Sequence, residues 1–330
     1  MKVLVTGGAG FIGSHLGERL LSEGHAVAAV DNLNDFYDPA VKRRNLEEIR
    51  RHPNASRFTL IEADIRDEKA MALAFSVEKP DAVVHLAAMA GVRPSIENPL
   101  LYEDVNVKGT ALLLETARLN HVRHFIFASS SSVYGNNPKV PFAETDNVDF
   151  PISPYAATKK AGELVCHTYA HLFQMNVSCL RFFTVYGPRQ RPDLAIHKFT
   201  RLILEDKPIP FFGGGQTKRD YTYIDDIVGG VMKAVAWTCD KSAGSKYGIF
   251  NLGESRVISL IEMVQAIEKV LGKKAKLHKL PDQPGDVQCT YADITHSRKT
   301  LGYNPTTDFE TGLRRFVDWF HATNRTKISS

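Results

Sequence analysis

Short apolar runs recur along the first half of the chain, separated by longer stretches in which apolar residues are spaced three or four apart. A short continuous apolar run is typical of a strand buried on both faces, and the wider spacing is typical of a helix with one buried side. Their alternation predicts a Rossmann-like, doubly wound parallel sheet with right-handed crossovers. The predicted strands are 3–5, 26–30, 58–63, 82–86 and 124–128, and the predicted helices are 12–21, 68–75 and 98–120.

The second half is less regular, because glycine, proline and charged residues become more frequent after Thr184. A chain of 330 residues is also long for one ordinary core, so a second unit is expected. We expect an α/β protein whose first domain covers 1–183, with a return strand near 248–252, and whose smaller C-terminal α/β lobe covers 184–330. The remaining predicted elements are a strand over 177–183 and helices over 155–173, 196–205, 225–238, 260–271 and 309–320.

A glycine pattern joins the first predicted strand to the first predicted helix. Gly7, Gly10 and Gly13 are each three residues apart. In a dinucleotide-binding turn, one glycine makes the bend, another lets the backbone approach a pyrophosphate, and the last lets helix and strand pack closely. The free N–H groups of the helix N-terminus then face the phosphates. Because strand, glycines and helix come in this order, we predict a dinucleotide site here.

Asp31 ends the second predicted strand, 18 residues after Gly13. A carboxylate at this place accepts hydrogen bonds from the adenosine ribose and repels a 2′-phosphate, which favours NAD over NADP. A turn or helix-cap role is the alternative, since Asp31-Asn32 also resembles a turn. The basic residues 42–44 could instead bind the 2′-phosphate of NADP, so NADP stays an alternative cofactor. They open a run of mixed charges over 42–51, which is typical of a solvated helix.

The candidate catalytic residues follow two later elements. Four serines, Ser129 to Ser132, come directly after a predicted strand, where hydroxyls of a parallel sheet face the ligand. Tyr155 and Lys159 are four apart on a predicted helix and therefore share a face. An ammonium beside a phenol favours the phenolate, which can act as a base. Such pairs also occur on ordinary helix surfaces, so only the accompanying glycines and serines favour hydride-transfer chemistry.

Composition adds few constraints. A net charge of +4 spread along the chain gives no reason to expect nucleic acid as a partner. Four scattered cysteines without a Cys-x-x-Cys spacing predict neither disulfides nor a zinc site, and His167 with His171 lacks a third metal ligand. We find no apolar run long enough for a membrane span and no signal peptide. We therefore expect a cytoplasmic protein without membrane or metal.

Together, the stretch Thr6–Gly13, the serine run and the Tyr155/Lys159 pair resemble the extended short-chain dehydrogenase/reductases over nearly the whole chain. Within them the chain is similar to the nucleotide-sugar 4-epimerases, and it most resembles the UDP-glucuronate 4-epimerases. The stretches that carry this second resemblance are 34–39, 90–99 and 181–189.

The resemblance implies a mechanism. Tyr155 takes the proton of the sugar C4 hydroxyl while a hydride passes from C4 to tightly bound NAD, and Ser130 bonds the same oxygen. Lys159 holds the nicotinamide ribose. The 4-keto sugar then turns its other face to the cofactor, and return of hydride and proton inverts C4. The resemblance also implies a homodimer, formed through the helices near 100–119 and 156–173.

The resemblance further assigns two sets of binding residues. The cofactor set is Gly7, Gly10, Phe11, Ile12, Gly13, Asp31, Asn32, Asp64, Ile65, Leu86, Ala87, Ala88, Asn106, Lys108, Tyr155 and Lys159. The set for a UDP-sugar substrate is Arg93, Ser130, Ser131, Ser132, Thr184, Arg189, Arg191, Phe199, Pro210, Phe212, Arg219 and Asp286. For the arginines, a solvated surface charge is the alternative.

Two positions argue against related chemistries. The sugar 4,6-dehydratases carry Asp-Glu where this chain has Ser131-Ser132, and the UDP-glucuronate decarboxylases carry Glu at the position of Ser132. Oxidising C4 of a glucuronate gives a β-keto acid that loses carbon dioxide readily. Uncharged hydroxyls from Ser131, Ser132 and Thr184 could hold its carboxylate. The alternatives are a UDP-glucose 4-epimerase and, in another class, a catalytically silent NAD-binding sensor.

Overall fold

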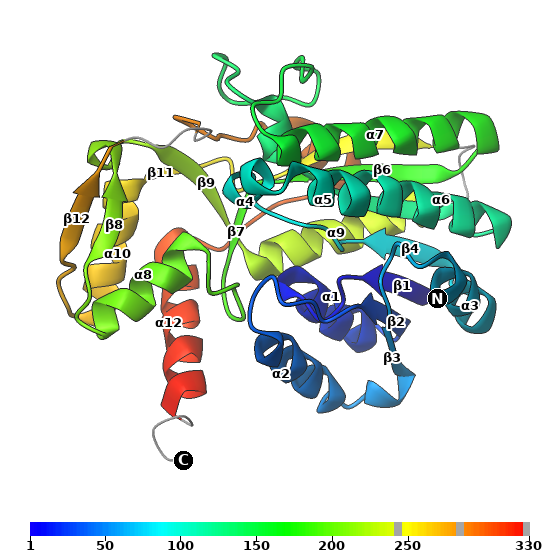
Figure 1. Ribbon diagram of the computed structural model, residues 1–330, viewed down its shortest axis with the longest axis horizontal. Helices are drawn as coiled ribbons and strands as arrows, with labels where there is room; N and C mark the ends of the chain where they lie inside the picture. Colours follow the sequence, from blue (N-terminus) through cyan, green and yellow to red (C-terminus); the bar gives the residue numbers. More distant parts are fainter. Residues whose placement is uncertain (241–245, 282–286, 326–330) are drawn as a thin grey trace.

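A sheet of seven parallel strands forms the centre of the computed structural model, which describes residues 1–240, 246–281 and 287–325 (Figure 1). The strand order is β10-β6-β5-β4-β1-β2-β3, so the chain reverses direction across the sheet between β1 and β4. Ligands bind outside the carboxyl ends of strands at such a point. The strands are β1 (Lys2–Thr6), β2 (Ala26–Asp31), β3 (Phe58–Glu62), β4 (Ala82–His85), β5 (His124–Ser130), β6 (Asn176–Phe182) and β10 (Tyr247–Leu252).

Helices cover both faces of this sheet, as the apolar runs predict. Because side chains alternate along a strand, Val3 and Val5 pack into one apolar core and Leu4 into another. One face carries α1 (Phe11–Ser22), α2 (Pro39–Arg50) and α9 (Ile224–Cys239), and the other carries α3 (Glu68–Glu78), α6 (Gly109–Leu119) and α7 (Pro154–Phe173). Figure 1 shows α7 beside β6 in the upper part of the view and α2 below α1 in the lower part.

The predicted helix over 98–120 is built of three successive segments. These are α5 (Pro99–Glu103), a π-helical turn (Asp104–Lys108) and α6, preceded by the short α4 (Val92–Glu97). A π-helical turn inside a helix often marks a functional site, because the extra residue redirects a side chain. Here the turn contains Asn106.

The C-terminal lobe contains two small sheets that the sequence analysis did not predict. One has the order β11-β9-β7 and the other is β12-β8. Most of their strands are short. Two of them, β7 and β11, have only three residues, which is too few to show a strand periodicity in the sequence. The elements are β7 (Thr184–Tyr186), α8 (Ala195–Leu204), β8 (Ile209–Phe212), β9 (Lys218–Tyr223), β11 (Val257–Ser259), α10 (Leu260–Leu271), β12 (Leu277–Leu280), α11 (Thr295–Leu301) and α12 (Phe309–Arg325).

The fold class expected from the sequence is confirmed, including the return strand, which is β10 beside β6. Helix α9 also packs on the first sheet and on α1, although it follows residue 183 in the chain. The division at 183/184 stays a prediction. Among the described residues, no helix combines the length and the apolar character that crossing a membrane requires.

Candidate active site

Main-chain atoms pack so tightly at Gly7 and Gly13, in the turn after β1, that a side chain at either position would clash with them. Gly7 has a φ of +69° and donates its N–H to the Val30 carbonyl at 2.8 Å. A Cβ placed on Gly13 would lie 2.1 Å from the Gly7 carbonyl oxygen. The glycines thus bring the start of α1 against the turn, where its free N–H groups face outward. This is the geometry that a bound pyrophosphate needs.

Asp31 lies at the end of β2, beside this turn. Its carboxylate accepts the N–H of Ala9 at 3.1 Å and that of Leu33 at 2.9 Å, and the side chain is buried. Each carboxylate oxygen has two lone pairs, so these bonds leave acceptor capacity for ribose hydroxyls. Asp31 also fills the alternative role of a turn residue, because its hydrogen bond with the Leu33 N–H closes a local turn.

The end of β3 supplies a second acid, Asp64, which is held by a small group of polar side chains. Asn32 donates to Asp64 at 2.9 Å, and Arg66 bonds both oxygens of Asp64 at 2.9 and 2.7 Å. The bonds from Arg66 are the main reason that the pKa of Asp64 falls to about 2. Asp64 is therefore a fixed anion at neutral pH. Arg66 also bonds Asp104, which ties this strand end to the π-helical turn.

Asn106 positions the segment after β4. Its side-chain amide both accepts from the Met89 N–H at 2.8 Å and donates to the Met89 carbonyl at 2.9 Å. It also donates to Thr158 on α7 at 3.1 Å. Asn106 is buried and fixes the main chain of Met89, and its direct contact with a cofactor stays a prediction.

The three predicted catalytic residues meet at the carboxyl ends of β4 and β5. Ser153 caps α7 by accepting the Ala156 N–H at 3.2 Å, which starts the helix immediately before Tyr155. The Ser130 hydroxyl accepts the Ser132 N–H at 3.1 Å and donates to the Ser132 hydroxyl at 3.2 Å, and it lies close enough to Tyr155 to lower the pKa of that phenol. One turn along, the Lys159 ammonium donates to the Ala128 carbonyl at 2.7 Å and lies 6.0 Å from the centre of the Tyr155 ring.

Burial and charge act in opposite directions on this phenol. Burial raises the pKa of Tyr155, whereas the nearby Ser130 hydroxyl and the charge of Arg191 lower it. Burial also lowers the pKa of Lys159 to about 8. At neutral pH most molecules therefore still carry an ammonium beside the tyrosine, and that charge favours the phenolate.

One hollow of about 810 Å³ collects most of these groups. The residues that line it include the glycine turn, Asp31 and Asp64, and also the serines, Tyr155 and Lys159. A hollow of this size suits a cofactor with a substrate beside it. The predicted residues that line it are Gly7, Gly10, Phe11, Ile12, Gly13, Asp31, Asn32, Asp64, Ile65, Leu86, Ala87, Ala88, Ser130, Ser131, Ser132, Tyr155, Lys159, Thr184 and Arg191.

Comparisons with known proteins agree with this geometry. The family model described as GDP-mannose 4,6 dehydratase matches residues 4–316. A UDP-glucuronate 4-epimerase from Thermodesulfobacterium geofontis is 46% identical over 318 residues, covering 96% of this chain and 95% of that protein. The chain belongs to the nucleotide-sugar epimerase family of extended short-chain dehydrogenase/reductases.

Solved structures of the family superpose on nearly the whole chain. The UDP-glucuronic acid 4-epimerase from Bacillus cereus, in complex with UDP-glucuronic acid and NAD, has a TM-score of 0.89 and 36% identity, covering 98% of this chain and 100% of that one. The UDP-glucose 4-epimerase from Thermotoga maritima, with UDP-glucose, has a TM-score of 0.87 and 33% identity, covering 98% and 99%. The family uses NAD, and the glycine turn and Asp31 fit that cofactor.

The other predicted substrate residues that the structure describes are not among those that line the hollow. Arg189 forms an ion pair with Glu18 of α1 at 2.9 Å. Arg93 of α4 lies 5.3 Å from the centre of the Phe212 ring on β8, so these two contact each other. Their roles, and those of the buried Phe199, of Pro210 on β8 and of Arg219 on β9, stay predictions. Asp286 lies outside the described residues.

Lys108 also sits apart from the hollow. Its side chain is 67% exposed, and its ammonium pairs with Asp104 at 3.2 Å. Arg191, in contrast, lies inside, where its guanidinium pairs with Asp193 at 2.7 Å and stacks on Phe36 at 5.1 Å. Among the described residues no group of three or more His, Cys, Asp or Glu side chains could hold a metal ion.

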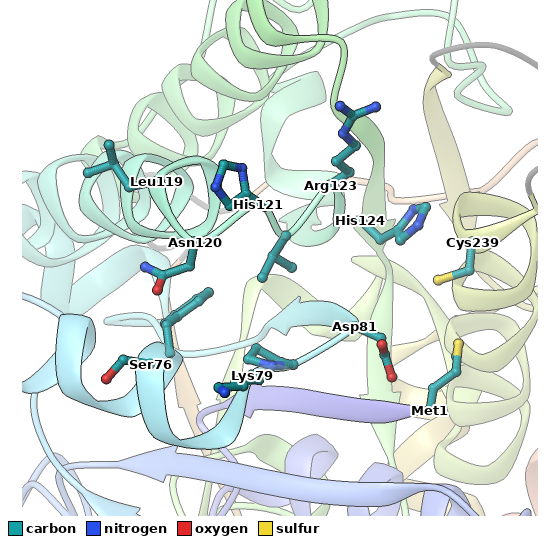
Figure 2. Close-up of a pocket in the computed structure, with 13 residues that line it drawn as sticks. Met1, Ser76, Lys79, Asp81, Leu119, Asn120, His121, Arg123, His124 and Cys239 are labelled. Carbon is teal, nitrogen blue, oxygen red and sulfur yellow. The ribbon is translucent and has the colours of Figure 1, made fainter.

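A second hollow, of about 850 Å³, opens at the opposite edge of the sheet (Figure 2). Lys79, His121 and Arg123 stand around it, at the ends of α3 and α6 and the start of β5. None of the predicted site residues lines it. It lies at the amino ends of the strands, and the ligand rule for such sheets points to the other edge.

Lys42 is a site residue that the sequence analysis missed. We expected a solvated helix over 42–51, but the Lys42 side chain is only 7% exposed and its ammonium lies 3.7 Å from Asp31. It donates to Asn34 at 2.8 Å and lies over the Tyr37 ring. Burial is the main cause that lowers its pKa. The run over 42–51 carries charges of both signs, so the sequence pattern does not show which one of them is buried.

We expect Lys42→Met to weaken NAD binding about tenfold, or ~1.4 kcal/mol. The substitution removes the cation that compensates the buried Asp31 carboxylate and releases the loop held through Asn34. Titration of NAD into cofactor-stripped protein, followed by calorimetry, measures the change. Arg43→Met is the matched control, because Arg43 is the next residue and is exposed. Equal affinities for the two variants would contradict a cofactor role for Lys42.

Proposed function

We propose that the protein is an NAD-dependent 4-epimerase that interconverts UDP-glucuronate and UDP-galacturonate through a 4-keto intermediate. The observation that carries the proposal is the set of hydroxyl side chains that lines the hollow together with Tyr155. Ser131, Ser132 and Thr184 line the hollow with hydroxyls. Ser131 and Ser132 stand where the sugar 4,6-dehydratases carry Asp-Glu, and the UDP-glucuronate decarboxylases carry Glu at the position of Ser132. The names of the relatives from Thermodesulfobacterium geofontis and Bacillus cereus support the same substrate.

The residues of the chain divide the chemistry between them. The phenolate of Tyr155 accepts the proton of the C4 hydroxyl, and Ser130 holds the same oxygen by a hydrogen bond. When bound, NAD supplies the acceptor and donor of the hydride. Lys159, buried against the Ala128 carbonyl, keeps a positive charge beside Tyr155 and stabilises its deprotonated form. Tyr155, which then carries that proton, returns it to the C4 oxygen once the 4-keto sugar has presented its other face.

The glucuronate carboxylate creates a second requirement. A carboxyl group β to a ketone loses carbon dioxide when its bond aligns with the carbonyl π system. Hydroxyl donors from Ser131, Ser132 and Thr184 would hold the carboxylate out of that alignment without adding a charge. Arg191 lies in the same hollow. Asp193 occupies its Nε and one Nη, so its other N–H groups are the donors for a phosphate or for the carboxylate.

Proton NMR of the purified protein with UDP-glucuronate tests this function. Formation of UDP-galacturonate is the expected result. UDP-xylose or a 4-keto-pentose would show that the hydroxyls do not protect the β-keto acid. Conversion of UDP-glucose to UDP-galactose alone would favour the second candidate, a UDP-glucose 4-epimerase, which the Thermotoga maritima structure supports. NAD binding without turnover of any nucleotide sugar would favour a sensor.

We also propose that two copies of the chain pair through α5, α6 and α7. Large apolar side chains are exposed on these helices: Leu100 by 78%, Leu172 by 66%, Leu119 by 61% and Leu164 by 56%. The three helices lie together on one side of the sheet (Figure 1). Exposed apolar patches of this kind mark interaction surfaces.

Leu164→Asp is expected to shift the protein to a monomer at micromolar concentration, because it buries a charge in the proposed interface. Sedimentation velocity over a dilution series measures the shift. Leu277→Asp, on a side chain of β12 that is 40% exposed, is the control and leaves the mass unchanged. If the wild-type protein already sediments as a monomer, the proposed dimer is wrong.

A further inference from the structure

A buried carboxylate lies directly beneath the catalytic residues, in a place that the proposed chemistry does not use. Glu163 follows Lys159 by one turn of α7 and is 1% exposed. Arg181, on β6, is equally buried and is among the largest fully buried side chains of the described residues. The two form a paired ion bridge, with Nε to Oε1 at 2.8 Å and Nη2 to Oε2 at 2.9 Å.

Glu163 also reaches the serine strand. The Ser129 hydroxyl donates to Glu163 Oε1 at 2.6 Å. Ser129 immediately precedes Ser130, which lines the hollow together with Tyr155. One carboxylate therefore joins the helix that carries Tyr155 and Lys159, the end of the strand that carries Ser130, and the strand that leads to Thr184.

The bonds continue on the other side of Arg181. Its Nη1 donates to the Tyr134 hydroxyl at 3.0 Å, and that hydroxyl donates to Asn251 of β10 at 2.7 Å. The Asn251 amide in turn donates to the carbonyls of Phe142 and Asp293. We call the five residues Ser129, Tyr134, Glu163, Arg181 and Asn251 the Glu163 network. It runs from the serines to segments of the second half of the chain.

Stability alone does not account for this network. Removing two charges from water is costly, and an apolar pair of the same volume would often stabilise a core as well or better. What an apolar pair could not do is fix directions, because hydrophobic contact is non-directional. Paired bonds between a guanidinium and a carboxylate have a set geometry. The network is suited to holding Ser130 and Tyr155 in register.

We propose that Glu163 and Arg181 are positioning residues for the epimerisation, acting through Ser129 to hold the end of β5, and with it Ser130, in place beside Tyr155. The proposal rests on the function proposed above for the same site. Neither residue lines the hollow, so neither touches substrate or cofactor. Their effect is on the rate of proton transfer and not on substrate affinity.

Ser129→Ala is the test, since it cuts the link to the serine strand and leaves the ion bridge in place. We expect kcat to fall about tenfold while KM for the UDP-sugar and the NAD content stay within twofold of wild type. Ser178→Ala is the matched control. Ser178 is also buried on a strand of the sheet, and it accepts one hydrogen bond from Thr238 at 3.0 Å, in a part of β6 that precedes Arg181. We expect this variant to keep its kcat.

A second measurement separates the proposal from the proposed function. Hydrogen exchange of the NAD-bound protein, followed by mass spectrometry, needs no turnover. Ser129→Ala should speed exchange in the peptide over 129–135 several-fold, and Ser178→Ala should leave it unchanged. If wild type turns over no UDP-sugar, the proposed function fails, and this measurement still decides the positioning role.

Glu163→Gln with Arg181→Met removes both charges together and avoids leaving one unpaired. We expect this double variant to fold, to bind NAD and to lose at least as much kcat as Ser129→Ala. Two results would overturn the proposal. One is that Ser129→Ala and Ser178→Ala lose melting temperature equally and both keep kcat. The other is a double variant with wild-type kcat.

Discussion

Tyr155→Phe is expected to lower kcat about 10³-fold, within the range of general acid–base catalysis. The variant lacks only the phenolic oxygen, which is the group proposed to take the C4 proton. Its ring remains and still packs edge-on against Tyr102 at 6.2 Å. The fold, NAD content and KM should therefore change little. Product formation by NMR, with NAD measured after denaturation, checks the prediction.

Tyr169→Phe is the control for this loss. It makes the same chemical change on the same helix, but its hydroxyl bonds Glu115 at 3.0 Å, away from the hollow. We expect wild-type turnover from it. A Tyr155→Phe enzyme within threefold of wild type would mean that another group is the base, and the assignment of the whole site would have to be changed.

Gly13→Ala is expected to abolish NAD binding. The added Cβ would lie 2.1 Å from the Gly7 carbonyl oxygen and 2.9 Å from the Gly8 Cα, and these are main-chain atoms that cannot turn aside. The turn or α1 must move, and the N–H groups that face the phosphates move with it. Overpacking of this kind also costs about 1–3 kcal/mol of stability. Absorbance of cofactor released from purified protein measures the loss.

Gly17→Ala provides the comparison, one turn further along the same helix. There the new Cβ would meet Ile49 Cδ1 at 3.5 Å, which is an ordinary contact. Alanine also favours the helix by up to about 1 kcal/mol over glycine. We expect NAD content to stay at the wild-type level and the melting temperature to stay level or rise. Equal NAD content in Gly13→Ala would refute the tight-turn argument.

The local features of this protein could be read from its sequence because they depend on residues close together in the chain. The buried strands, the glycine turn and the Tyr155/Lys159 face follow from spacings of two to four residues. Asp31 and the serines were placed by the rule that ligands lie at the carboxyl ends of parallel strands. Each of these predicted side chains lies at the hollow.

Features that depend on contacts between distant segments needed the tertiary structure. Nothing in the run over 42–51 shows that Lys42 faces Asp31, because only the packing of α2 against the sheet decides which of its charges is buried. The pairs Arg189–Glu18 and Arg93–Phe212 join residues separated by more than a hundred positions. Glu163 and Arg181 lie on α7 and β6, and nothing in the sequence of either element indicates that these two charges pair. Local spacing determines which element forms, whereas the partner of a buried charge depends on which elements meet, and that is fixed only when the whole chain has folded.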